Sequence, residues 1–147
     1  MEIAVLACGC FWGPEIKFSK LKGIYRTEVG YCGGNTSKTS YKEVCTGDTN
    51  HAEVVKLEFD PNKISYEKIL EFFFQIHDPT TLNSQGPDFG TQYRSEIFYL
   101  NDNQKNIAEK ITKKFNEKLS GKVVTKISLL KNYCIAEEYH QKYLDKN

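Results

Sequence analysis

The stretch IAVLACGCFWGPE, residues 3–15, decides how this chain folds. Its first six residues are apolar at odd and even positions alike, which is typical of a strand buried on both faces at the centre of a sheet. Pro14 and Glu15 suit the first turn of a helix, because proline needs no N–H donor there and a carboxylate stabilises the positive helix end. The stretch therefore predicts a central strand, a tight turn at Gly9 and a helix that begins near Trp12.

Outward from this stretch, apolar periodicity and turn residues divide the chain into further elements. Strands are expected at 24–31, 51–59, 94–100 and 123–130, loops at 35–50 and 78–92, and helices at 12–21, from Ser65 to about His77, from about Asp102 to Gly121, and at 136–144. The order β-α-β-β-α-β-α-β-α favours an α+β fold. We expect a two-layer sandwich with a ferredoxin-like βαββαβ core, a mixed sheet, and an extra C-terminal helix and loops.

Length and charge bound the class of protein. The 147 residues indicate a single domain over residues 1–147, and 20 basic against 19 acidic residues give a net charge of +1. This balance provides no field that would attract nucleic acid or an acidic membrane surface. The apolar run 3–8 is too short to cross a bilayer, and Met1-Glu2 lacks the basic start of a secretory signal, so neither membrane insertion nor export is expected.

The five cysteines are an odd number, so they cannot all pair within one chain. Reduced thiols are expected instead, which favours a cytoplasmic protein. The cysteines and the three histidines lack the spacing of a metal site, and no metal is expected. The sequence therefore raises the question of which thiol does chemistry.

Cys10 is the candidate nucleophile, because it lies between a buried strand and the start of a helix. Unpaired N–H groups and the helix dipole at that position favour a thiolate, so we expect a lowered thiol pKa. Phe11 and Trp12 follow at once and can form an apolar wall beside the sulfur. The alternative is a buried structural cysteine followed by two core rings, and position alone does not decide between them.

Glu53 shares one face of its expected strand with the apolar residues of the segment 55–59, because side chains alternate along a strand. Burial would raise the carboxyl pKa and keep the group neutral, which makes it a proton donor for a developing oxyanion. The alternative is that Glu53 lies near the strand end and reaches water. Tyr41 and Tyr93 lie in the expected loops, where a phenol can donate to an oxygen or simply pack.

Five segments of the chain resemble, in the same order, motifs of the A-type peptide methionine sulfoxide reductases. They are GCFWG at 9–13, YKEVCTG at 41–47, HAE at 51–53, DFGTQYRS at 88–95 and AEEYHQKY at 136–143. Five motifs in register over nearly the whole chain make the resemblance specific. It implies an α+β sandwich around a ferredoxin-like core that reduces the S epimer of methionine sulfoxide, free or in proteins, and so repairs oxidised proteins.

The resemblance also implies the nucleophile and the walls of its pocket. Cys10 would attack the sulfur of the sulfoxide, while Phe11 and Trp12 would enclose the S-methyl group of the substrate. Methionine would leave, and Cys10 would become a sulfenic acid, the first and reversible step of thiol oxidation.

The sulfoxide oxygen has its own set of residues in this resemblance. Tyr41, Glu53 and Tyr93 would hold it, and Asp88 would help through an ordered water. A thiolate attacks the partly positive sulfur only if the oxygen gains a proton, which neutral Glu53 would supply while the phenols stabilise the charge.

Many family members reduce the oxidised nucleophile with recycling cysteines that follow the Tyr-His-Gln motif. This sequence departs from that pattern, because no cysteine follows the motif here. Cys134, just before that motif, is the first choice for an internal thiol that forms a disulfide with Cys10 for reduction by thioredoxin. Cys32 is the second choice, Cys45 is expected to be a packed residue, and Cys8 is awkwardly placed on the strand that precedes Cys10. The other route uses glutathione and glutaredoxin, and neither route needs a bound cofactor.

Two other functions are compatible with the pattern of residues. A cysteine acyl-transferase or hydrolase would use Cys10 with His51 or His140 as the base. A non-catalytic binding module would use the aromatic residues as a cage for a methylated ligand. The five motifs favour the reductase over both, and a monomer is expected.

Overall fold

The structure is a computed structural model that describes residues 1–146. Its helices are α1 (Trp12–Ser19), α2 (Tyr41–Thr46), α3 (Tyr66–Gln75), α4 (Asp102–Lys118) and α5 (Tyr143–Lys146), and its 3₁₀ turns are η1 (Thr91–Tyr93) and η2 (Glu138–His140). Its strands are β1 (Glu2–Cys8), β2 (Ile24–Cys32), β3 (Ala52–Phe59), β4 (Ser84–Gln85), β5 (Asp88–Phe89), β6 (Ser95–Tyr99), β7 (Lys126–Leu129) and β8 (Cys134–Ile135).

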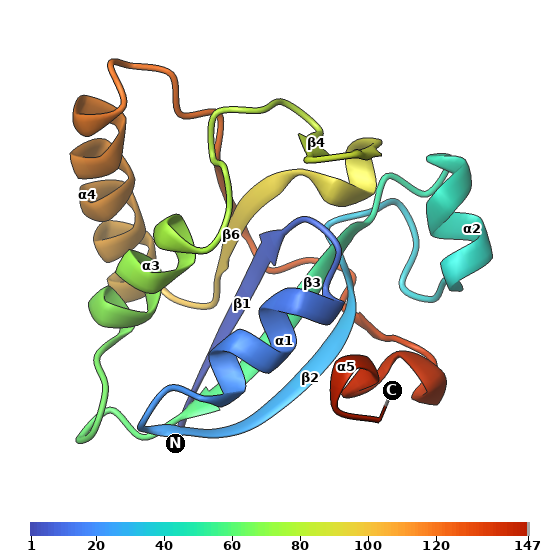
Figure 1. Cartoon of the computed structure of the whole chain (residues 1–147), viewed down its shortest axis with the longest axis horizontal. Coiled ribbons are helices and arrows are strands. Elements are labelled where there is room, and N and C mark those ends of the chain that lie inside the picture. The colour runs from blue at the N-terminus through green and yellow to red at the C-terminus, as the bar shows by residue number, and fades with distance from the viewer. Residues whose placement is uncertain (147) are drawn as a thin grey trace.

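The main sheet has the strand order β7-β6-β1-β3-β2-β8, and β4 and β5 form a separate small hairpin. The four strands β6-β1-β3-β2 are antiparallel and are joined by α1 and α3, which is the ferredoxin-like arrangement. β7 lies parallel to β6, so the whole sheet is mixed. The structure therefore confirms the predicted α+β fold, and Figure 1 shows α1 packed in front of the sheet with α3 and α4 to one side.

Alternation along β1 decides which residues face which layer. Ala4 and Leu6 join the larger core together with the buried residues of α1, α3 and α4. Val5 and Ala7 point to the opposite face, where they pack with Val54 and Phe98 under the segment 130–133. This burial on both faces agrees with the apolar run that predicted a central strand.

Helix α3 begins where the sequence predicts. The hydroxyl of Ser65 accepts a hydrogen bond from the backbone N–H of Lys68 at 3.1 Å, which satisfies a free donor of the first turn. Asn101 caps α4 in the same way through the N–H of Gln104. Gly121 has φ +76° and follows that helix, which ends at Lys118.

Three expectations about the connections are wrong. The expected loop 35–50 contains α2, and the expected loop 78–92 contains the β4–β5 hairpin. The expected helix 136–144 is replaced by η2 and α5. The backbone N–H of Ala136 bonds to the carbonyl of Val29, and this pairing with the edge of β2 keeps the segment extended. Among the described residues 1–146, no helix is long and apolar enough to cross a membrane.

Candidate active site

Cys10 occupies a tight turn between the end of β1 and the start of α1. The turn depends on Gly9, whose φ of +93° favours glycine. A Cβ atom at Gly9 would lie only 2.7 Å from Cγ of Gln85, so the 78–92 segment packs directly on this turn. Cys10 itself is half-buried, and its neighbour Cys8 is buried. The structure thus leaves Cys10 partly open to solvent at the point where the chain enters the helix.

The predicted lowering of the Cys10 pKa is wrong. Burial raises the pKa of the thiol to about 11, and the negative charges of Glu53 and Asp88 add to the rise. A hydrogen bond from the backbone N–H of Trp12 acts in the opposite direction, as the helix-start argument expects. Desolvation is the larger effect, so the resting group is a thiol.

Glu53 is 1% exposed, which rules out the alternative that it reaches water at the strand end. Its Oε1 atom accepts a hydrogen bond from the backbone N–H of Phe11 at 3.2 Å, and Oε2 has no protein partner within residues 1–146. Burial raises the pKa of Glu53 to about 8, helped by the charge of Asp88 and opposed by the Phe11 N–H. This direction agrees with the expectation of a neutral carboxyl group at pH 7, which stays a prediction.

The two phenols come from different elements and meet near Glu53. Tyr41 is the first residue of α2, and Tyr93 is the last residue of η1. Burial raises the pKa of both hydroxyl groups, and the charge of Glu53 raises both further. A hydrogen bond from Tyr41 lowers the pKa of Tyr93, while a hydrogen bond with Cys45 raises that of Tyr41. Two neutral O–H donors therefore lie within the electrostatic reach of the neutral carboxyl group.

Asp88 adds a negative charge to the same site from the β4–β5 hairpin. It is half-buried, and its charge raises the pKa of both Cys10 and Glu53. The following turn is fixed by Arg94, which donates to the carbonyl of Thr91 at 2.8 Å and to Oε1 of Glu96 at 2.6 Å. Three connections therefore bring Cys10, Tyr41, Tyr93 and Asp88 toward Glu53 of β3.

The two aromatic residues after Cys10 are held differently. Phe11 is 1% exposed, with its ring 5.7 Å from that of Tyr31 and 5.2 Å from that of His140. Trp12 is half-buried, and its Nε1 donates to Nδ1 of His140 at 3.1 Å. The indole ring also stacks on Tyr143, with centroids 3.9 Å apart and planes within 14°. Trp12 is therefore the partly exposed member of the predicted apolar wall.

Glu137 is a residue of this site to which the sequence assigns no role. Its Oε1 accepts from the hydroxyl of Tyr31 at 2.8 Å, and its Oε2 accepts from the backbone N–H of Tyr41 at 3.0 Å. One carboxylate therefore joins the C-terminal segment, β2 and the start of α2. The only sequence signal was its place in the AEEYHQKY motif.

The predicted resolving thiol, Cys134, lies in β8 at the edge of the main sheet. In register across the strands, Cys134 of β8 faces Tyr31 of β2, which in turn faces Glu53 of β3. Two strand spacings separate the Cα atoms of Cys134 and Glu53 by about 10 Å. Cys134 is half-buried, and its Sγ atom lies 3.7 Å from the carbonyl oxygen of Thr39. Tyr31, which lies between Cys134 and Glu53 in the sheet, is fully buried.

The remaining cysteines differ in accessibility. Cys8 and Cys32 are buried, and burial raises the pKa of both thiols, to about 12 and about 11. Cys45 is exposed, so the expectation of a packed residue is wrong. In the six residues of α2, Val44 alone is buried, and Cys45 falls on the open side of the helix.

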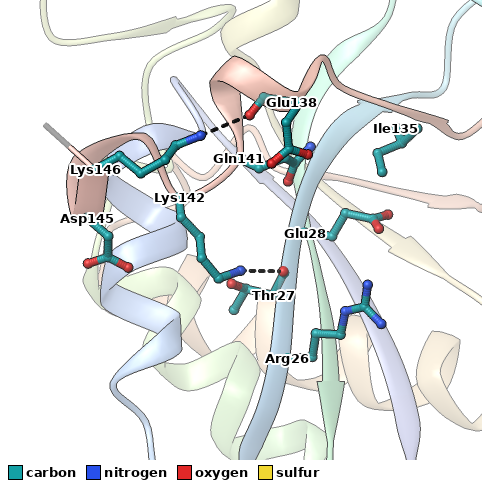
Figure 2. Close-up of a pocket in the computed structure, with 9 residues that line it drawn as sticks. All are labelled: Arg26, Thr27, Glu28, Ile135, Glu138, Gln141, Lys142, Asp145 and Lys146. Atoms are coloured by element: carbon teal, nitrogen blue, oxygen red, sulfur yellow. Dashed lines mark hydrogen bonds between the residues drawn. The ribbon is translucent and has the colours of Figure 1, made fainter.

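A groove of about 390 Å³ lies beside the C-terminal segment, and none of the predicted site residues lines it. Figure 2 shows two hydrogen bonds among the residues that line it, from Lys142 to the carbonyl of Thr27 and from Lys146 to that of Glu138. Its charged residues have both signs. Among the described residues, no cluster of three or more His, Cys, Asp or Glu side chains could hold a metal ion.

The histidines do not provide a base for Cys10. Nδ1 of His140 already accepts from Trp12. His51 packs so closely on Gly34 that a Cβ atom there would lie 2.1 Å from its Nδ1. In residues 1–146, no hydrogen bond joins Cys10 to a histidine.

Comparison with known proteins gives one consistent result. The family described as peptide methionine sulfoxide reductase matches residues 2–147. The peptide methionine sulfoxide reductase MsrA of Pelagibacter ubique is 78% identical over 146 residues, which are 99% of this chain and 99% of that protein. The probable peptide methionine sulfoxide reductase of Schizosaccharomyces pombe is 50% identical and covers 100% of this chain and 90% of its own length.

Solved structures agree with the sequence relatives. Mxr1 of Saccharomyces cerevisiae in its reduced form superposes with a TM-score of 0.95 at 47% identity, over 99% of this chain and 85% of that one. Mxr1 in complex with Trx2 superposes with a TM-score of 0.70 at 28% identity, over 97% and 84% of the two chains.

Proposed function

This chain belongs to the peptide methionine sulfoxide reductase family and is an oxidoreductase that uses thiols to reduce methionine sulfoxide; from this premise we propose that Cys10 is its nucleophile and Glu53 its proton donor. The observation that carries the proposal is the hydrogen bond between the Phe11 N–H and Glu53, which ties a buried neutral acid to the turn that holds Cys10. Family membership does not favour an acyl-transferase or a binding module.

In the proposed reaction the proton of the Cys10 thiol passes to the Glu53 carboxylate, so the reacting pair carries one proton, on Glu53, while Cys10 is a thiolate. The thiolate attacks the sulfur of the sulfoxide, and Glu53 transfers its proton to the oxygen. The hydroxyl group then passes from the substrate sulfur to the sulfur of Cys10, so the sulfur–oxygen bond of the substrate and the transient sulfur–sulfur bond both break. Methionine leaves, Cys10 becomes a sulfenic acid, and Glu53 is left as a carboxylate. Methionine sulfoxide is reduced by two electrons, and Cys10 is oxidised by two.

The other site residues hold the substrate in this scheme. The hydroxyl groups of Tyr41 and Tyr93 donate to the sulfoxide oxygen and stabilise its charge, and Asp88 assists through an ordered water. Phe11 and Trp12 provide the apolar wall for the S-methyl group. The proposed substrates are the S epimers of free and protein-bound methionine sulfoxide, so the enzyme repairs oxidised proteins.

We propose that Cys134 regenerates the enzyme. Its thiol condenses with the sulfenic acid of Cys10, which gives a disulfide and water, and the dithiol of thioredoxin then reduces the disulfide. β8 supports this assignment, because it is a two-residue strand at the edge of the sheet, where local opening costs less than in the central strands. The Mxr1–Trx2 complex supports thioredoxin as the donor. Glutathione with glutaredoxin is the alternative, and neither route requires a bound cofactor.

We also propose a single catalytic domain over residues 1–147, a monomeric state and a cytoplasmic location.

One experiment tests the chemistry. The protein is incubated with peptides that carry either epimer of methionine sulfoxide, with dithiothreitol as reductant. The S epimer should be consumed and the R epimer left, and Cys10→Ser should abolish turnover while Cys8→Ala, a thiol change on the preceding strand, should retain it. Loss of the R epimer, or turnover by Cys10→Ser, would refute the proposal.

A second experiment tests the resolving thiol. After a single turnover without reductant, peptide mapping by mass spectrometry should identify a Cys10–Cys134 disulfide. Cys134→Ser should retain turnover with dithiothreitol and lose most of the turnover that thioredoxin supports. If thioredoxin supports Cys134→Ser as well as wild type, Cys134 is not the resolving thiol.

A further inference from the structure

The side chain of Trp12 is held on its edge and on one face by the C-terminal segment. On the edge, Nε1 donates to Nδ1 of His140 at 3.1 Å. On the face, Tyr143 stacks at 3.9 Å between ring centroids. A hydrogen bond fixes the rotation of the indole, and stacking fixes its plane. Both contacts come from residues more than 120 positions away in the sequence.

The bond from Trp12 determines the state of the His140 ring. Nδ1 can accept only if it carries no proton, so the ring is neutral with its proton on Nε2. His140 is 1% exposed, and burial lowers its pKa while the charge of Glu137 opposes that change. The neutral, accepting ring is therefore the ordinary form at pH 7. The other groups around the ring are aromatic: Phe11, Trp12, Tyr41 and Tyr139.

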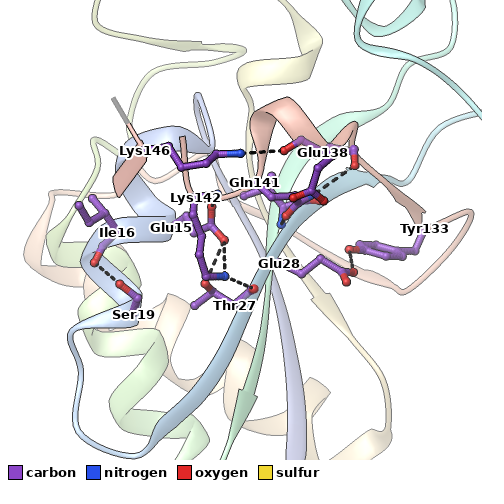
Figure 3. Close-up of polar contacts among 12 residues, drawn as sticks. Glu15, Ile16, Ser19, Thr27, Glu28, Tyr133, Glu138, Gln141, Lys142 and Lys146 are labelled. Carbon is purple, nitrogen blue, oxygen red and sulfur yellow. Dashed lines mark hydrogen bonds and ion pairs between the residues drawn. The ribbon is translucent and has the colours of Figure 1, made fainter. Parts of the chain in front are cut away.

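The backbone on either side of His140 is anchored to α1 and β2. The buried carboxylate of Glu15 accepts from the backbone N–H of Lys142 at 2.7 Å and from the hydroxyl of Thr27 at 2.9 Å. The amide of Gln141 bonds to both the N–H and the carbonyl of Val29. Figure 3 shows Glu15, Thr27 and Lys142 in this cluster.

Lys142 connects the two residues that hold Trp12, and its conformation is unusual. Its φ of +50° lies in the left-handed region, which non-glycine residues seldom adopt. The bond to Glu15 holds it there. The turn directs the chain from His140 at the edge of the indole to Tyr143 on its face, so these anchors fix both contacts together.

We propose that His140 is a positioning residue for substrate binding: its Nδ1 atom orients the indole of Trp12 so that the ring face away from Tyr143 receives the S-methyl group of methionine sulfoxide. The inference rests on the proposed role of Trp12 as a wall of the substrate pocket. His140 neither touches the reacting atoms nor exchanges a proton with them. In this role it acts through Trp12.

The test compares two variants at His140. His140→Leu removes the acceptor, whereas His140→Asn places a carbonyl oxygen near the position of Nδ1. Because Trp12 is the only tryptophan, an ¹H–¹⁵N spectrum contains a single indole N–H signal that reports this bond directly. His77→Leu is the control, since His77 is a half-buried histidine that bonds to Phe73 and Ser95 and not to Trp12. Single-turnover kinetics with an S-sulfoxide peptide give the substrate affinity and the limiting rate.

His140→Leu should shift the indole N–H signal upfield, speed its hydrogen exchange, and weaken the single-turnover affinity about two- to tenfold, the range for one lost hydrogen bond. The limiting rate should stay within about twofold, because the methyl wall binds ground state and transition state alike. His140→Asn should restore both the signal and the affinity, and His77→Leu should change neither.

Two results would overturn the inference. One is an indole signal in His140→Leu that matches wild type. The other is a shifted signal with unchanged affinity. In that second case Trp12→Leu locates the failure: if it also leaves the affinity unchanged, the proposed pocket role of Trp12 is wrong, and if it weakens the affinity, the role of His140 alone is wrong.

Discussion

The backbone N–H of Phe11 donates to Oε1 of Glu53 at 3.2 Å, while Oε2 has no partner among the residues the structure describes. Because Oε1 accepts a hydrogen bond, the proton of the neutral acid resides on Oε2. The residue after the nucleophile therefore decides which oxygen of the acid is the donor. A substrate that places its sulfoxide oxygen beside Oε2 would satisfy the buried O–H group.

The first prediction concerns Glu53→Gln. The amide can still hydrogen-bond to the sulfoxide oxygen but cannot protonate it, so the single-turnover rate should fall by about 10²- to 10⁴-fold. Rapid-quench measurement of methionine formation gives that rate. Glu58→Gln, the same change farther along β3, should leave it within about twofold of wild type. A fully active Glu53→Gln variant would show that the proton comes from another group.

The second prediction is that the single-turnover rate depends on pH through the coupled titration of Cys10 and Glu53. The pKa of Glu53 is raised to about 8 and that of Cys10 to about 11, so the pair holds two protons below pH 8 and one between these values. The one-proton form reacts, so the single-turnover rate should rise about tenfold per pH unit up to about 8 and then level.

The dependence of the single-turnover rate on pH also shows whether Cys10 attacks as a thiolate or as a thiol. In Glu53→Gln the break near pH 8 should disappear, because only Cys10 then titrates, with a lower pKa than before since the charge of Glu53 is gone. Stopped-flow experiments between pH 6 and pH 10 cover the range. A wild-type rate that falls above pH 8 would mean that the neutral thiol attacks.

Sequence patterns within single elements predicted where Glu53 and Cys10 lie. The alternation of β3 placed Glu53 on the core side, and the apolar run before Gly9 placed Cys10 at the end of a central strand. The sequence predicted a lowered pKa for the Cys10 thiol, whereas the structure raises it. The sequence reveals the helix start but not the desolvation of the thiol or the nearby charges of Glu53 and Asp88.

Contacts between distant segments account for the other errors. Segment 136–144 has a helical pattern but does not form one helix, because Gln141 forms hydrogen bonds with Val29, which is 112 positions away. Helix α2 has six residues, too few for a periodic signal, although Ser40 and Glu43 form a capping pair that marks its start. The link from Glu137 to Tyr31 and Tyr41 joins residues about 100 positions apart, and no spacing rule predicts it.

The third prediction concerns the turn before the nucleophile. Gly9→Ala forces a side chain into a positive-φ position and against Gln85, so it should lower the free energy of unfolding by about 1–3 kcal/mol. Urea denaturation measures the loss. Gly13→Ala, where a Cβ atom meets nothing within 4 Å, should be neutral or stabilising. Combining Gly9→Ala with Gln85→Ala should recover only the part due to the clash, and full recovery would show that the backbone is unstrained.

The last prediction concerns the carboxylate that joins three parts of the site. Glu137→Gln replaces one accepting oxygen with an NH₂ group, which must face either the Tyr31 hydroxyl or the Tyr41 N–H. Loss of one such bond should cost about 1–3 kcal/mol in urea denaturation. Because Tyr41 begins α2 and is proposed to hold the substrate oxygen, the single-turnover rate should fall as well.

The neighbouring residue provides the control for that change. Glu138 is exposed, and its contact with Lys146 uses the backbone carbonyl, so Glu138→Gln should alter neither stability nor rate. Tyr31→Phe removes one of the two partners of Glu137 without moving α2, so it should lower stability more than it lowers the rate. If Glu137→Gln lowers stability while the rate stays at the wild-type level, the carboxylate supports the fold without setting the position of Tyr41.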